Sequence, residues 1–162
     1  MRVHIRYCVE IETPPASSPA VHNVMIANTS KDTEPELRVR RMLREAGYPG
    51  YRLHWRIDDK EGRYVCRPDI TYPGRRLAIF VHGCFWHRCP TCNLDLPKTN
   101  TEYWRQKFER NVERDRRKES ALRGLGWNIH TIWECEIDSG TILPAQLPIH
   151  FPRKGPEYIF RN

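Results

Sequence analysis

The sequence contains no apolar run close to the roughly 18 residues that a membrane-spanning helix requires. Its first residues, Met1 to Arg6, also lack the continuous apolar stretch of a signal peptide. We see no internal repeat. We therefore expect a cytoplasmic protein with no membrane partner. In a reducing cytoplasm, clustered cysteines are more often metal ligands than disulfides.

Positive charge is plentiful. The 162 residues include 27 Lys and Arg against 20 Asp and Glu, which gives a net charge of +7 and a pI of about 9.3. This length predicts one domain, and 39% hydrophobic residues allow a modest core that a metal ion would help to stabilise. The charge favours a polyanionic partner, most commonly nucleic acid. A basic domain without such a partner is the alternative.

The N-terminal residues differ in pattern from the rest of the chain. Residues 3–11 alternate apolar and polar side chains, which predicts a strand, and the run 13–19 is rich in Pro and Ser like a linker. We therefore divide the chain into an extension (1–24), a main domain (25–137) and an irregular C-terminal segment packed on that domain (138–162).

The main domain shows alternating helical and strand patterns. Thr33 predicts a helix start, with Pro35 in its first turn and Gly47 as its stop. Strands are predicted over 51–55, 64–72 and 77–81, with polar and Pro-Gly turns between them. A long helix over 101–125 and a final strand over 127–135 follow. This order predicts an α/β fold with a mixed sheet flanked by helices.

Four cysteines have the spacing of a metal site. Cys84, Cys89 and Cys92 lie within nine residues, and Cys135 ends the last predicted strand. Four thiolates suit one tetrahedral Zn²⁺, and a site with no open position is structural. Buried or free thiols are the alternative. Zinc would join the loop to the last strand.

Acid and base groups surround this loop. Asp69 falls in a predicted strand, where Asp is disfavoured, so a hard cation such as Mg²⁺ would explain it, and a strand-end turn is the alternative. The turn at Pro73 and Gly74 would fold Asp69 back beside His82 and His87. A neutral His can take a proton from water, although a lone His is more often structural.

The long predicted helix carries both an apolar stripe and a basic face. Asp115 falls on the apolar stripe, where a carboxylate needs a cation or a hydrogen-bond donor. It would support the site, and a salt bridge with Arg67 or a neighbouring Arg is the alternative. The basic face is either solvated or a phosphate-binding surface. Phe85, Trp86 and Trp104 either pack in the core or wedge between base pairs. The arginines proposed to contact DNA are Arg110, Arg114, Arg116 and Arg117.

Several segments together resemble the very short patch repair (Vsr) endonucleases. They are Phe80 to His87, Trp104, Arg110 to Arg117, Gly126-Trp127 and Trp133 to Cys135, with Thr33 to Leu37 and Pro68-Asp69. The resemblance covers about residues 25–137. It implies a restriction-endonuclease-like fold with one structural zinc, in a bacterial-type cell. It also implies a monomer that nicks one strand of double-stranded DNA, 5′ of the thymine in a T:G mismatch left by deaminated 5-methylcytosine.

The resemblance also implies a role for each site residue. Asp69 and the carbonyl of Val81 would bind Mg²⁺, two ions being expected, and His87 would be the general base. His82, Glu36 and Asp115 would support the phosphate, the metal-bound waters and the histidines. Phe85, Trp86 and Trp104 would form the wedge, and Cys84, Cys89, Cys92 and Cys135 would hold zinc.

Three departures and two rival functions accompany this resemblance. Residues 1–24 match nothing expected, Val81 stands where Thr is familiar, and the zinc set is all cysteine. One rival is a zinc-stapled DNA-binding module with an inactive site. The other is a related nuclease without mismatch specificity, for instance in defence against foreign DNA. The presence of Asp69, His82 and His87 favours an enzyme.

Overall fold

A computed structural model of the chain describes residues 14–15 and 31–141. The strand predicted over 3–11 and the segment 142–162 lie outside the described residues, as does most of the Pro/Ser-rich run. The domain boundaries predicted at 24 and 137 therefore remain predictions.

A four-stranded mixed sheet forms the centre of the described part, in the order β1-β4-β5-β6. Its strands are β1 (Arg52–Leu53), β4 (Ile70–Tyr72), β5 (Leu77–His82) and β6 (Asn128–Trp133). The first three pair antiparallel, whereas β6 runs parallel to β5. A parallel pair requires a crossover connection, and α3 (Thr101–Gly124) supplies it. The predicted mixed α/β architecture is confirmed.

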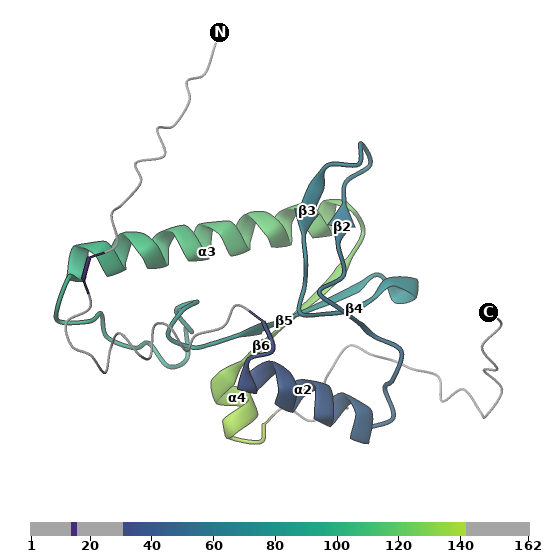
Figure 1. The fold of residues 1–162 in the computed structure, drawn as a ribbon, viewed down its shortest axis with the longest axis horizontal. Coiled ribbons are helices and arrows are strands. Elements are labelled where there is room, and N and C mark those ends of the chain that lie inside the picture. The colour runs from purple at the N-terminus through teal and green to yellow at the C-terminus, as the bar shows by residue number, and fades with distance from the viewer. Residues whose placement is uncertain (1–13, 16–30, 142–162) are drawn as a thin grey trace, which may run out of the picture.

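Helices cover both faces of this sheet (Figure 1). On one face α2 (Glu34–Glu45) and α4 (Glu134–Asp138) pack together, and α3 runs across the other. The alternation of side chains along β5 divides the core between the two faces. Leu77, Ile79 and Val81 join the cluster that contains α2, and Ala78 and Phe80 join the cluster that contains Leu122 of α3.

The strand predicted over 64–72 is two strands. β3 (Tyr64–Cys66) pairs with β2 (Ile57–Asp58) in a separate two-stranded ribbon, and β4 begins only at Ile70. Pro68 lies in the break, because proline has no N–H to donate to a ladder. Asp69 therefore lies immediately before a strand and not within one. The predicted turn at Pro73 is the short 3-10 helix η1 (Pro73–Arg75).

The prediction of a strand over 127–135 was wrong at its C-terminal end. β6 ends at Trp133, and Cys135 lies in the first turn of α4. The carboxylate of Glu136 accepts a hydrogen bond from the backbone N–H of Trp133 at 2.8 Å, which satisfies a donor at the helix start and favours helix over strand here. Among the described helices, none is both long and apolar enough to cross a bilayer.

Candidate active site

The end of β5 delivers two histidines to the α3 side of the sheet. His82 follows Ala78 and Phe80 in the alternation of β5, and it is buried. The loop after it turns back in helical fashion, with the N–H of His87 donating to the carbonyl of Gly83 at 3.2 Å. This turn stacks the ring of His87 on that of His82, with centroids 3.9 Å apart and planes 9° apart.

His87 is hydrogen-bonded to α3. Its Nδ1 lies 2.6 Å from Oδ2 of Asp115, and Lys118 lies 3.5 Å from the other oxygen of that carboxylate. Burial alone would raise the pKa of Asp115, but its hydrogen bond with His87 and the surrounding positive charges hold that pKa below its usual value. An ionised Asp115 fixes the proton of His87 on Nδ1 and leaves Nε2 as the basic atom.

His82 has a different environment from His87. It is packed edge-on against the ring of Trp133, with centroids 5.3 Å apart. Burial, and next the nearby positive charge of His87, lower the pKa of His82 to about 3. His82 is therefore neutral across the physiological range.

Asp69 lies across the β4–β5 hairpin from the histidine loop. Its Oδ2 accepts a hydrogen bond from the backbone N–H of Val81 at 2.8 Å, and no described residue donates a hydrogen bond to its Oδ1. Burial raises the pKa of Asp69 to about 6, opposed first by the Val81 N–H. The carboxylate of Glu36 raises this pKa further, and charge on His54 or His87 lowers it. Groups from α2 and from the loop after β5 thus act on one carboxylate.

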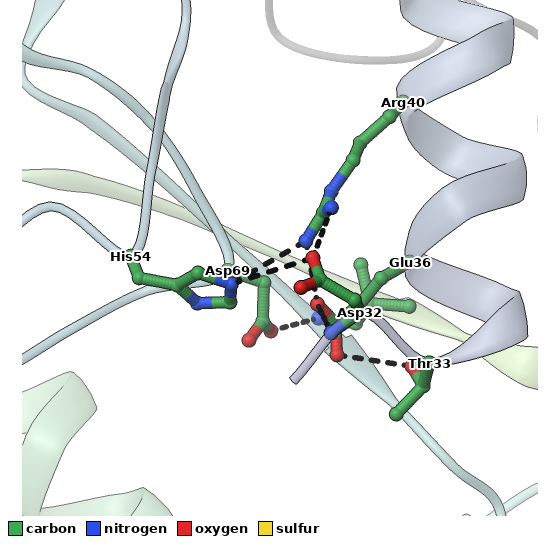
Figure 2. Close-up of polar contacts among 7 residues, drawn as sticks. Asp32, Thr33, Glu36, Arg40, His54 and Asp69 are labelled. Carbon is green, nitrogen blue, oxygen red and sulfur yellow. Dashed lines mark hydrogen bonds and ion pairs between the residues drawn. The ribbon is translucent and has the colours of Figure 1, made fainter. Parts of the chain in front are cut away.

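A second polar cluster lies on the α2 side of Asp69, where Figure 2 draws it. The buried Glu36 accepts hydrogen bonds from the hydroxyl of Thr33 at 3.0 Å, the N–H of Asp32 at 3.1 Å and the guanidinium of Arg40 at 2.8 Å. Arg40 also pairs with the Asp32 carboxylate, and it lies 3.4 Å from Nε2 of His54.

Sequence reasoning found Glu36 in this cluster but missed Asp32, Arg40 and His54. The signal for Arg40 was its position four residues after Glu36, the spacing at which helical side chains meet. His54 gave no such signal, because it lies just past the two-residue strand β1 with a positive φ of 47°.

The four predicted zinc ligands lie together. The four sulfur atoms all lie within 4.8 Å of one another in the set Cys84, Cys89, Cys92 and Cys135. Those of Cys89 and Cys135 are 3.8 Å apart. The backbone N–H of Cys135 points to the sulfur of Cys84 at 3.4 Å. A metal ion could therefore be bound here, joining the start of α4 to the loop that carries His87.

The predicted wedge aromatics also gather in one place. Phe85, Trp86 and Trp104 have ring centroids between 5.1 and 5.9 Å apart, and Phe108 lies behind Phe85 at 5.0 Å. Trp104 is only 7% exposed, whereas Phe85 and Trp86 are partly exposed. The ammonium of Lys107 lies over the rings of Trp86 and Trp104. The amide of Asn111 donates to the carbonyl of Trp86 at 3.2 Å, tying this loop to α3.

All four predicted DNA-contacting arginines are exposed on α3: Arg110, Arg114, Arg116 and Arg117. Arg114 and Arg117 contact Asn111 and Glu113 on the same helix, at 3.2 and 3.4 Å. Such exposed pairs are weak and leave the cations available to a polyanion.

The chain shares its sequence pattern with known DNA endonucleases. The family model "DNA mismatch endonuclease Vsr" matches residues 18–93. The type II nicking enzyme V.XorIIP of Xanthomonas oryzae pv. oryzae is 45% identical over 118 residues, which cover 73% of this chain and 82% of that protein. The DNA mismatch endonuclease Vsr of Escherichia coli strain K12 is 39% identical over 113 residues, covering 70% of this chain and 68% of that protein.

Among solved structures, the chain is similar to the catalytic domain of the homing endonuclease I-Bth0305I. The match has 27% sequence identity and a TM-score of 0.39, and it covers 68% of this chain and 85% of that domain.

Proposed function

This chain belongs to the Vsr family of DNA mismatch endonucleases and is a DNA endonuclease, and on that premise we propose that it nicks one strand of a duplex on the 5′ side of the thymine in a T:G mismatch. The reaction would start the repair of deaminated 5-methylcytosine in the cytoplasm of a bacterial-type cell. We propose a restriction-endonuclease-like arrangement of the sheet and a monomer, since nicking one strand needs a single active site.

The observation that carries this proposal is the short path of contacts between two kinds of group: Asp69 accepts the N–H of Val81, and the next residue, His82, stacks on His87. The His87–Asp115 pair offers a basic Nε2, and the carboxylate of Asp69, which is sensitive to charge on His87, offers an Oδ1 to which no described residue donates a hydrogen bond. His87 would accept the proton of the attacking water, and Asp115 would stabilise the imidazolium that forms. His82, neutral and stacked on His87, would keep that ring in place.

The residues present fit a hard divalent cation at Asp69. A cation stabilises a buried carboxylate whose pKa is raised and whose Oδ1 receives no hydrogen bond from the part of the chain that the structure describes. Oxygen ligands are those that Mg²⁺ prefers. We propose that Asp69 and the backbone carbonyl of Val81 hold Mg²⁺. When bound, Mg²⁺ supplies charge neutralisation for the phosphodiester and lowers the pKa of coordinated water.

The cysteine cluster fits Zn²⁺. Zinc–sulfur bonds of about 2.3 Å in a tetrahedron put the sulfurs about 3.8 Å apart. The distance between the sulfurs of Cys89 and Cys135 is 3.8 Å. We propose one structural zinc bound by Cys84, Cys89, Cys92 and Cys135. It would hold the loop that carries His87 against the end of the sheet.

Substrate binding is proposed for the aromatic cluster and the exposed arginines of α3. Phe85 and Trp86 are partly exposed and would insert into the base step at the mismatch. Trp104 is buried and contacts Trp86, so it would either pack against these two rings or separate from them when DNA binds. A mismatched pair costs less to unstack than a matched pair, so deformation contributes to selectivity. The arginines would neutralise backbone phosphates.

A second candidate is a nicking enzyme without mismatch preference. Several relatives, V.XorIIP among them, are named type II nicking enzymes, and their names mention no mismatch. An inactive DNA-binding module is a weaker alternative, because the acid and base groups are all present.

A nicking assay separates these candidates. The substrates are two labelled duplexes that differ only in one T:G or T:A pair, incubated with Mg²⁺, and Asp69→Asn serves as the inactive control. Cleavage of the T:G duplex alone, 5′ of the thymine, is expected. Equal nicking of both duplexes would refute mismatch specificity. Tight binding without nicking would identify the inactive module.

A further inference from the structure

Arg40 is a buried cation that no role described above uses. Its side chain is 7% exposed, and it lies on α2 one turn after Glu36. A guanidinium remains charged at every accessible pH, so its burial requires anionic partners. Two of its partners are carboxylates: Nη2 contacts Glu36 at 2.8 Å and Nη1 contacts Asp32, while His54 lies 3.4 Å from Nη2. Figure 2 shows all three converging on the guanidinium.

The partners of Arg40 have the composition of a cation site. Asp32, Glu36 and His54 each offer a ligand atom, and these atoms lie within 4.8 Å of one another. A divalent ion would fit such a set by chemistry alone. The guanidinium, however, already contacts the same carboxylates, and two cations at one cluster repel each other strongly in a partly buried site.

Glu36 itself has little capacity left for a metal ion. A carboxylate offers about four acceptor positions. On Glu36, Oε2 receives the Asp32 N–H and the Arg40 guanidinium, and Oε1 receives the Thr33 hydroxyl. One acceptor position on Oε1 remains, which suits a water molecule better than direct ligation. Oδ1 of Asp69, by contrast, has no hydrogen-bond donor among the described residues.

We propose that Arg40 is a positioning residue that occupies the cation position between Asp32, Glu36 and His54, so that the protein alone binds one divalent cation, at Asp69, and not two. The guanidinium supplies the second positive charge of the site and holds the Glu36 carboxylate in place through its 2.8 Å contact. The inference rests on the proposed function only in taking Asp69 as the metal ligand. A second Mg²⁺, expected from the family resemblance, would then need the DNA phosphate to hold it.

The test counts bound Mn²⁺ in the absence of DNA, by the loss of the free Mn²⁺ signal in electron paramagnetic resonance. Mn²⁺ accepts the same oxygen ligands as Mg²⁺. The full-length protein should bind one Mn²⁺, and Asp69→Asn should bind none. Arg40→Gln removes the guanidinium and should raise the count to two. Arg40→Lys keeps a positive charge and should bind one.

Arg38→Gln is the matched control for Arg40→Gln. Arg38 lies on the same helix, is partly exposed and pairs with Asp138, so its loss changes net charge equally without freeing the cluster. The Arg38→Gln variant should bind one Mn²⁺. Circular dichroism and zinc content confirm that each variant is folded. Two ions on the unmodified protein would overturn the proposal even if Arg40→Gln failed to fold. One ion on a folded Arg40→Gln would overturn it as well.

The two proposals fail in different ways. If the protein binds one Mn²⁺ at Asp69 but nicks T:G and T:A duplexes equally, mismatch specificity is refuted and the proposed role of Arg40 stands. If it nicks the T:G duplex alone but binds two Mn²⁺ without DNA, the proposed function stands and the role of Arg40 is refuted.

Discussion

Replacing Asp69 by Asn should stabilise the fold while it removes activity. Burial raises the pKa of Asp69 to about 6, so the ionised carboxylate is disfavoured in the folded state relative to the unfolded chain, where its pKa is 3.8. Asn keeps an oxygen that can accept the N–H of Val81. It carries no charge to desolvate, so the variant avoids this cost at neutral pH.

The magnitude follows from linkage between protonation and folding. A folded pKa of about 6 against 3.8 makes the folded state bind more protons between these values, so stability falls as pH rises through that window. Relative to the unfolded chain, the raised pKa of Asp69 costs about 3 kcal/mol of stability at pH 7.5 and about 1.5 kcal/mol at pH 5. The stability advantage of Asp69→Asn should therefore widen by about 1.5 kcal/mol from pH 5 to pH 7.5.

Urea denaturation of the unmodified protein and of Asp69→Asn at several pH values measures this difference in the free energy of unfolding. Magnesium is removed by dialysis and not by a chelator, so that any bound zinc stays in place. Asp95→Asn is the control, because Asp95 is exposed, and its loss should give a gap that does not change with pH. Adding Mg²⁺ should stabilise the unmodified protein and not Asp69→Asn. A gap that is constant from pH 5 to pH 7.5 would refute the reasoning.

Three further outcomes are expected. His87→Ala should stay folded and lose at least about 100-fold in nicking rate, as measured in single-turnover assays, since a general base contributes on that scale; near-normal nicking would exclude His87 from the reaction. Asp115→Asn should lower the rate and shift the acid limb of the pH–rate profile, because the anion that stabilises the His87 imidazolium is lost; an unchanged profile would contradict the pairing. Elemental analysis should find one zinc per chain, and Cys89→Ser should lower that content and the melting temperature together; a metal-free protein that melts normally would remove the zinc assignment.

Long periodic elements were predictable from the sequence, because their patterns come from burial on one face. The buried run of β5 and the apolar stripe of α3 are examples, and both lie where expected. Short elements were not predictable. β1 and β2 have two residues each, too few to show a period, and a single hydrogen bond from Trp133 to Glu136 decided that Cys135 is helical.

The residues of the candidate site also differ in whether a local sequence pattern could identify them. His82, His87, Cys84, Cys89 and Cys92 could be identified because they are close in sequence, at the end of β5 and in the loop after it. The juxtaposition of α2 with Asp69 depends on how a helix packs on the sheet, and no local pattern encodes that. Arg40 and His54 were therefore missed, although charge on His54 lowers the pKa of Asp69 and Arg40 contacts both His54 and Glu36.

The parallel pairing of β5 with β6 has a consequence for biosynthesis. Because β6 follows the cysteine loop and all of α3, β5 lacks this neighbour until the ribosome has released nearly all of the described residues. Contacts so distant along the chain form late in folding. A nascent chain that contains Asp69 and His87 but not β6 therefore lacks part of the sheet that carries the proposed cleavage centre. Strand topology thus delays the assembly of that centre until β6 has been synthesised.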